Sequence, residues 1–268
     1  MKHKIFTCLL AALFFTSCSK EFLEIEPQDR LTADNFYRNE TEIKAATASL
    51  YGFPWFDFND KLFWLVGDEM AGNLYYTYDQ EGQFFYFSFT EGNSYLSSGW
   101  KSLYRVVSYS NSIINDMPRA ASGQAPQAVI DRALGEARFM RGMAYFLLAE
   151  LWGDVPIVEN STELVANNNL LLPKNKRANV YEFVRRDLAF AAANLPGSDV
   201  PGRVTQWTAK GMLAKLHLTM AQQLNDSKSA ENFALAKQYA ADVIEKGRIG
   251  NPFRRRAIMS SYQVIYAA

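Results

Sequence analysis

The chain has 268 residues, of which 49% are hydrophobic, so it can bury a sizeable core. Its 28 basic residues balance 28 acidic ones, and this charge balance argues against nucleic acid as a partner. The two histidines are His3, at the extreme N-terminus, and His217, inside an apolar helical pattern where we expect a core residue. A Ser-His-Asp triad or a multi-histidine metal site is therefore not expected, and no cofactor is predicted.

The N-terminus has the pattern of a secretory signal peptide over residues 1–17. Lys2 and Lys4 precede the apolar run 5–15, which is too short to span a bilayer as a helix. Loss of both lysines with the leader would leave 26 basic residues against 28 acidic ones.

Cys18 follows the small residues Thr16 and Ser17, just after the end of the apolar run. Phe15-Thr16-Ser17-Cys18 resembles a bacterial lipobox, in which the cysteine is acylated, although Phe15 replaces the usual aliphatic residue. We therefore expect a lipid anchor at Cys18 and a polar tether over 18–35. The other cysteine, Cys8, leaves with the leader, so the mature chain would have no disulfide. A plain secreted protein is the alternative.

The first predicted helix begins at Asn39, whose spacing to Glu42 predicts a capping box, and ends at Gly52. The stretch 51–104 holds nearly half of all Phe, Trp and Tyr residues in about a fifth of the chain. Glycines interrupt it, which predicts loops or short strands, with a possible strand at Phe84 to Phe89.

Helical periodicity becomes clear after this stretch. Pro118 is predicted to end the first long helix, and Asn179 with Glu182 predicts another capping box. A connection over 154–176 separates two of the helices. The predicted helices are Trp100 to Pro118, Pro126 to about Trp152, Asn179 to Leu195, Thr205 to Gln223 and Ala230 to Lys246.

Small and large apolar residues alternate along these helices, as in Ala137-x-x-Met140. This pattern favours closely stacked helical hairpins, formed by 126–152 with 178–195 and by 205–223 with 230–246. The predicted fold class is mainly all-α, with tetratricopeptide-like helical hairpins and an aromatic-rich irregular loop region.

Several motifs, taken in order, resemble the SusD/RagB family of nutrient-binding outer-membrane lipoproteins. The central one runs from Gly135-Glu136-Ala137-Arg138 through Tyr145-Phe146 to Leu151-Trp152-Gly153-Asp154-Val155-Pro156. The resemblance covers Cys18 to about Gly247. The other matching pieces are Phe22-Leu23-Glu24 with Pro27; Trp100, Tyr104 and Asn111; Val180-Tyr181-Glu182-Phe183 with Asp187-Leu188 and Leu195-Pro196; and Gly202-Arg203-Val204-Thr205 with Ala209-Lys210.

This resemblance implies a helical scaffold whose loops bind a glycan or another nutrient. It also implies a location on the cell-surface side of the outer membrane, and a SusC-like TonB-dependent barrel as the transport partner. Residues 36–249 would form the N-terminal part of such a helical domain. Family members run considerably further, and residues 250–268 do not resemble their continuation. We therefore expect a truncation or a reading-frame change near Ile249. A divergent short member of the family is the alternative.

The aromatic-rich stretch supplies the candidate ligand-binding residues, because sugar sites combine flat rings with a few polar groups. Core packing is the competing interpretation for these aromatic residues. The candidates are Asp68, Glu69, Asn73, Tyr75, Tyr76, Tyr78, Asn93 and Tyr95.

Catalysis is the weaker hypothesis. Glycoside hydrolysis needs two carboxyl groups facing each other across a cleft, and the neighbours Asp68 and Glu69 are better interpreted as solvated loop acids. Glu136, Arg138 and Arg141 lie on a helix that looks buried, so we expect an ion pair or a hydrogen-bonded brace there. A binding protein for peptides and a non-functional remnant remain alternatives to the glycan-binding function.

Overall fold

The computed structural model describes Thr32 and residues 36–76, 78–169 and 171–247. The chain divides into two compact units after Phe36, and the helices belong to the second unit. The predicted signal peptide, Cys18 and the 250–268 tail lie outside the described residues. Within the described ranges, no helix combines the length and the apolar character needed to cross a bilayer.

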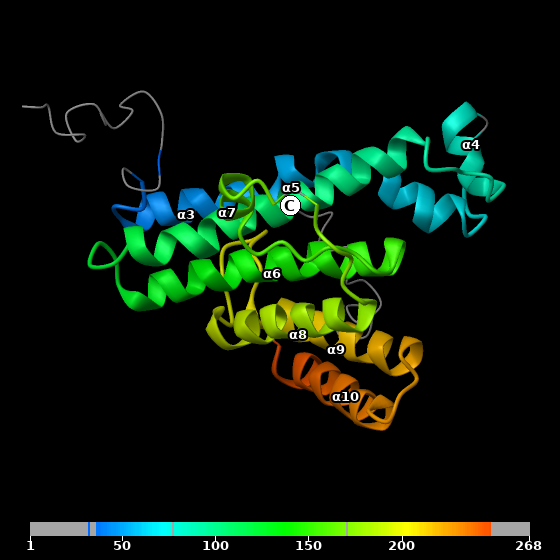
Figure 1. Ribbon diagram of the computed structural model, residues 1–268. Coiled ribbons are helices and arrows are strands. Elements are labelled where there is room, and N and C mark those ends of the chain that lie inside the picture. Colours follow the sequence, from blue (N-terminus) through cyan, green and yellow to red (C-terminus); the bar gives the residue numbers. More distant parts are fainter. Residues whose placement is uncertain (1–31, 33–35, 77, 170, 248–268) are drawn as a thin grey trace, which may run out of the picture. The chain divides into compact units, whose positions relative to one another are not determined.

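Five long helices dominate the described residues. They are α5 (Ser94–Ala120), α6 (Gln127–Trp152), α8 (Arg177–Asn194), α9 (Gln206–Gln223) and α10 (Ser229–Lys246). Each of them packs against the next in this order, as Figure 1 shows. The all-α fold class and both predicted hairpins, α6 with α8 and α9 with α10, are therefore confirmed. A short helix, α7 (Ser161–Ala166), lies in the connection between α6 and α8.

The segment before α5 is a series of short helical turns instead of the predicted loops and strands. Two of these turns, η3 and η4, are wide π-type turns. The segments are α3 (Glu40–Ala48), η1 (Ser49–Tyr51), η2 (Phe53–Trp55), η3 (Phe58–Leu62), η4 (Leu65–Glu69) and α4 (Asp79–Phe85).

The prediction of a strand at Phe84 to Phe89 was wrong. Phe84 and Phe85 end α4, and the backbone then turns through Phe87 with a φ of 51°. This turn brings the ring of Phe89 onto that of Phe84, with the ring centroids 5.1 Å apart. The turn therefore buries Phe84 against Phe89 without a partner strand, while Tyr86 and Phe87 remain exposed.

The helix ends agree only in part with the predicted signals. Asn39 does cap α3, because its side chain accepts a hydrogen bond from the Glu42 backbone N–H at 3.0 Å. The Glu42 carboxylate, however, accepts from the backbone N–H of Arg38, so the reciprocal half of the predicted capping box is displaced by one residue. α5 continues beyond Pro118 to Ala120, because a proline in the last turn removes only one helical hydrogen bond.

α8 begins at Arg177, two residues before the predicted start at Asn179. Its first turn is capped by Asp154, whose carboxylate accepts from the Arg177 backbone N–H at 2.8 Å and from Lys176 Nζ at 2.9 Å. Glu182 pairs with Arg185 and takes no part in a cap. The cap therefore comes from a residue 23 positions away, which a local sequence pattern cannot reveal.

Glycines allow α6 to approach α8 closely. A Cβ at Gly142 would lie 3.4 Å from the Cβ of Asp187, and one at Gly135 would lie 3.2 Å from the Cγ of Leu195. The first distance is ordinary contact and the second is already tight, so larger side chains would push the helices apart. This geometry explains why the α6 sequence alternates small and large residues.

Arg141 lies buried between three helices. Its guanidinium donates to both carboxylate oxygens of Asp187 on α8, at 2.7 and 2.8 Å, and to Asn111 Oδ1 on α5 at 2.8 Å. The predicted brace is confirmed for this residue. Because the contacts are bidentate and buried, they fix the distance and rotation of α5, α6 and α8 relative to one another.

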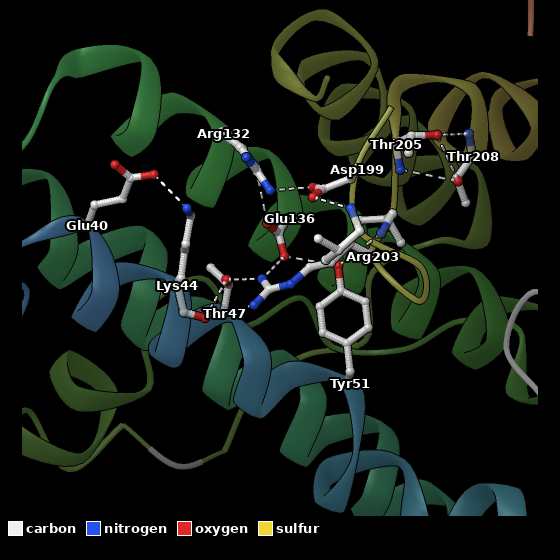
Figure 2. Close-up of polar contacts among 12 residues, drawn as sticks. Glu40, Lys44, Thr47, Tyr51, Arg132, Glu136, Asp199, Arg203, Thr205 and Thr208 are labelled. Atoms are coloured by element: carbon white, nitrogen blue, oxygen red, sulfur yellow. Dashed lines mark hydrogen bonds and ion pairs between the residues drawn. The ribbon is translucent and has the colours of Figure 1, made fainter. Parts of the chain in front are cut away.

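Glu136 forms a second buried cluster, shown in Figure 2. Its carboxylate accepts from Arg203 at 2.7 Å and from the Tyr51 hydroxyl at 2.9 Å. Arg203 also donates to Thr47 Oγ1 at 2.6 Å. Segments that are far apart in the sequence, α3 with η1 and the loop before α9, are thereby joined to α6.

The predictions for the two remaining polar core residues, Arg138 and His217, had different outcomes. Arg138 makes no ion pair among the described residues, and its guanidinium lies 4.3 Å from the ring centroid of Phe190. The brace prediction was therefore wrong for Arg138, which stacks on an aromatic ring instead. His217 is buried as predicted, with Nδ1 2.8 Å from Asn232 Oδ1 and its ring stacked on Tyr239.

We predict that Arg141→Ala lowers the free energy of unfolding by about 3–5 kcal/mol, because Asp187 would remain buried without its partner charge. Chemical denaturation measures this change. The control is Arg185→Ala, which breaks the exposed pair with Glu182 and should cost no more than about 1 kcal/mol. Equal losses in the two variants would contradict a stabilising role for the buried pair.

Candidate functional site

Aromatic side chains gather where η2, η3, η4 and α4 meet the N-terminal part of α5. Contacts join α5 to η2 and η3, and α4 to η4. Figure 1 shows α4 beside the N-terminal end of α5, away from α8, α9 and α10. Many of these rings are not covered: Phe53, Phe56, Tyr75, Tyr78, Tyr86 and Phe87 are each more than half exposed.

Three of the four predicted tyrosines belong to two separate ring groups. The first ring group is Tyr75, Phe85 and Tyr86, in which Tyr75 lies 4.8 Å from the Phe85 ring and its hydroxyl is 3.0 Å from the Tyr86 hydroxyl. Residues 74–76 belong to no helix or strand, and the Tyr76 ring contacts a different set of rings, those of Trp64 and Tyr78. Tyr75 is therefore separated from Tyr76, although the two are neighbours in the sequence.

The second ring group is Trp64, Tyr76 and Tyr78. The Tyr76 centroid lies 5.9 Å from Trp64 and 5.2 Å from Tyr78. The ammonium of Lys61 lies over both Trp64 and Tyr76, at 5.4 and 5.9 Å from their centroids. Tyr78 is 67% exposed, so this group also offers an open ring to a ligand.

The polar side chains of Lys61, Glu81 and Tyr95 lie beside the second ring group. The Tyr95 hydroxyl donates to Glu81 at 2.5 Å, and Lys61 lies 3.9 Å from the same carboxylate. The hydrogen bond to Glu81 and partial burial raise the pKa of Tyr95 to about 12, so this phenol stays protonated at neutral pH. Tyr95 thus joins α5 to α4, the helix at whose C-terminal end Phe85 and Tyr86 lie.

Glu69 and Asn93 are buried and cannot reach a ligand at the surface. Burial raises the pKa of Glu69, the Tyr76 backbone N–H partly opposes this shift, and the Glu81 carboxylate adds to it. Asn93 caps α5 by accepting from the Tyr95 backbone N–H, and it donates to Gln83 Oε1 at 3.0 Å. Both residues therefore shape the segment from within.

Asp68 and Asn73 are exposed, as a ligand contact requires. Asp68 lies in η4 next to the buried Glu69, and not on a loop as predicted. Since one of these carboxyl groups faces solvent and the other the interior, they do not face each other across a cleft as hydrolysis would require. Among the described residues, no group of three or more His, Cys, Asp and Glu residues is arranged to hold a metal ion.

Sequence reasoning missed Phe85 and Tyr86, which complete the first ring group, and Trp64 and Lys61, which complete the second. Phe85 and Tyr86 belong to the run that was interpreted as a strand. Their helical spacing was hidden because α4 has only seven residues, fewer than two full turns. Taken together, the two groups offer flat exposed rings beside hydroxyl groups, an arrangement suited to the apolar faces of sugars.

Comparison with known proteins identifies the family of this chain. Residues 21–218 match the SusD-like family described as "starch-binding associating with outer membrane". A SusD-like protein of Bacteroides ovatus is 34% identical over 267 residues, which is 99% of this chain and 47% of that protein. A SusD-like protein of Formosa agariphila is 26% identical over 80% of this chain and 41% of its own length.

Solved structures extend the likeness to the fold. One, crystallised with a xylogluco-oligosaccharide, is 36% identical, with a TM-score of 0.69 over 76% of this chain and 40% of its own. A SusD homologue from Bacteroides thetaiotaomicron, 20% identical, has the same fold with a TM-score of 0.69 over 84% of this chain and 44% of its own. The chain thus spans about half the length of these relatives. Since the family match covers most of the sequence, the chain belongs to the SusD-like family.

Proposed function

We propose that this protein is a lipoprotein of the bacterial cell surface that binds a glycan through the two ring groups. It would pass the glycan to a SusC-like TonB-dependent barrel in the outer membrane, over which it would act as a lid. The observation that carries the proposal is the exposure of Tyr75, Tyr78 and Tyr86 on the short-turn segment before α5. Binding and delivery, without catalysis, is the activity that this surface supports best.

The rings would supply the contact area, and the polar groups would orient the sugar. A sugar presents apolar C–H faces that pack on a ring, while its hydroxyls need hydrogen-bond partners around the rim. Tyr75 and Tyr86 offer two hydroxyls 3.0 Å apart, and Asp68 and Asn73 are the exposed polar candidates that remain. Tyr95 would act indirectly, by holding Glu81 and α4 in place.

A neighbouring structure supports a glycan as the ligand. The structure that is 36% identical was crystallised with a xylogluco-oligosaccharide. Xyloglucan oligosaccharides are therefore the first probe to use. A peptide or another non-glycan nutrient is the second candidate, because exposed tyrosines also bind apolar side chains; a glycan array compared with a peptide library distinguishes the two.

We predict that Tyr75→Ala/Tyr86→Ala weakens binding of xyloglucan oligosaccharides by about tenfold to a hundredfold. A part-buried ring contributes roughly 1.4 kcal/mol, which is a factor of ten in affinity. Isothermal titration calorimetry measures the change. Tyr76→Ala/Tyr78→Ala tests the second ring group in the same way.

The matched control is Tyr109→Ala, which removes a part-exposed tyrosine on α5 outside both ring groups. It should leave the affinity unchanged, and all variants should keep the helical circular dichroism of the wild type. If wild type binds a glycan and neither double variant loses affinity, the ring groups are not the binding surface.

We also predict that Cys18→Ser releases the protein from the membrane fraction. Two or more acyl chains on Cys18 would provide stable anchoring, since each buried methylene contributes about 0.8 kcal/mol. Mass spectrometry of the wild-type protein should find the N-terminal residue to be an acylated Cys18. An intact leader and an unmodified Cys18 would rule out the lipoprotein.

A further inference from the structure

The connection between α6 and α8 is fastened along α5 by three side chains. Tyr104 donates to the Pro156 carbonyl at 2.7 Å, Asn111 to that of Val158 at 2.7 Å, and Asn115 to that of Glu159 at 2.9 Å. The spacing of seven and then four residues places the three donors on one face of α5. After Glu159 the chain continues into α7.

A pocket of about 300 Å³ opens where the chain turns into α7. Its volume lies at the lower end of the range for small-molecule sites, so it could hold about one sugar ring. Every lining side chain except one alanine is polar. The lining residues are Asn111, Ser112, Asn115, Asp116, Asn160, Ser161, Thr162, Glu163 and Ala166.

The free polar groups of this pocket are mainly hydrogen-bond acceptors. Asn115 uses one of its two amide N–H groups for the Glu159 carbonyl, which leaves the second N–H and the amide oxygen. Ser112 donates to the Ser108 carbonyl, which leaves the lone pairs of its hydroxyl oxygen. The Asp116 carboxylate makes no hydrogen bond or ion pair with another described residue. The hydroxyls of Ser161 and Thr162 can both accept and donate.

This set of groups selects the kind of ligand. Acceptors in excess, with two carboxylates and no Lys, Arg or His in the lining, disfavour an anion and favour a molecule rich in hydroxyl donors. A metal ion fits poorly, because no described cluster has three or more His, Cys, Asp and Glu residues placed to hold one. A neutral polyhydroxylated ligand matches both the volume and the chemistry.

We infer that the pocket between α5 and α7 is a second carbohydrate-binding site, which takes a single neutral sugar unit. Asp116 and Asn115 accept hydrogen bonds from sugar hydroxyls on the α5 side, and Thr162 contacts the sugar on the α7 side. Asn115 follows Ser94, the first residue of α5, by 21 positions, or about 30 Å along the helix axis. The site is therefore separate from the ring groups and does not depend on their binding a glycan.

Nuclear magnetic resonance of the isotope-labelled full chain tests this inference, with D-glucose, D-galactose and D-xylose as probes. At least one of these should cause saturable shifts of the backbone amides of residues 112–116 and 160–163. The dissociation constant should be on the order of millimolar, as for a small ligand in an open site. Thr162→Trp places a bulky ring in the pocket and should abolish the shifts.

Val165→Trp is the matched control, because Val165 lies on the same short helix, is 68% exposed and does not line the pocket. It should keep the shifts, and so should Tyr75→Ala/Tyr86→Ala, which separates this site from the proposed glycan surface. The inference is overturned if none of the three sugars causes saturable shifts there, or if the shifts persist in Thr162→Trp. Shifts caused only by calcium chloride would overturn it as well, since the pocket would then be a cation site.

Discussion

The buried contact between Arg141 and Asp187 determines the arrangement on which the rest of the structure depends. A guanidinium removed from water is tolerated only if its donors are satisfied, and here Asp187 on α8 and Asn111 on α5 satisfy them. The geometry of the pair is bidentate, so α6 cannot slide or rotate against α8 without leaving a charge unpaired. Because Asn111 is on α5, the same contact fixes the helix whose N-terminal end supports the ring groups and whose C-terminal part lines the polar pocket.

The segment that carries the exposed rings is fastened at its two ends. At its start, Tyr51 reaches the Glu136 cluster on α6, and at its end Asn93 joins α4 to the cap of α5. Between these points the backbone follows short turns, with Trp55, Phe58, Leu62 and Leu65 buried as anchors. A segment held in this way can leave large rings in contact with water, because its position does not depend on burying them.

The sequence predicted the long helices well, because their signals are local. Pro126, Gly153, Thr205 and Gly247 mark helix ends at or within one residue of the observed bounds. The start of α8 could not be found in this way, since its cap is Asp154 from the preceding connection. For the candidate site, the sequence predicted the region of the chain but not how its side chains are arranged. Short turns have no periodicity, so the sequence could not indicate that Glu69 and Asn93 are buried. Nor could it indicate that Tyr86 contacts Tyr75.

The charge environment of the rings favours a neutral ligand over a charged one. The hydrogen bond with Tyr86 raises the pKa of Tyr75, so this phenol stays neutral at ordinary pH. Beside the second ring group, Lys61 and Glu81 lie 3.9 Å apart and largely offset each other's charge. A charged ligand would lose hydration at this surface without gaining a strong counter-charge, whereas a sugar exchanges water for rings and hydroxyls at little cost. The same physical argument that favours sugars at the rings therefore makes a glycan a better candidate than a charged peptide.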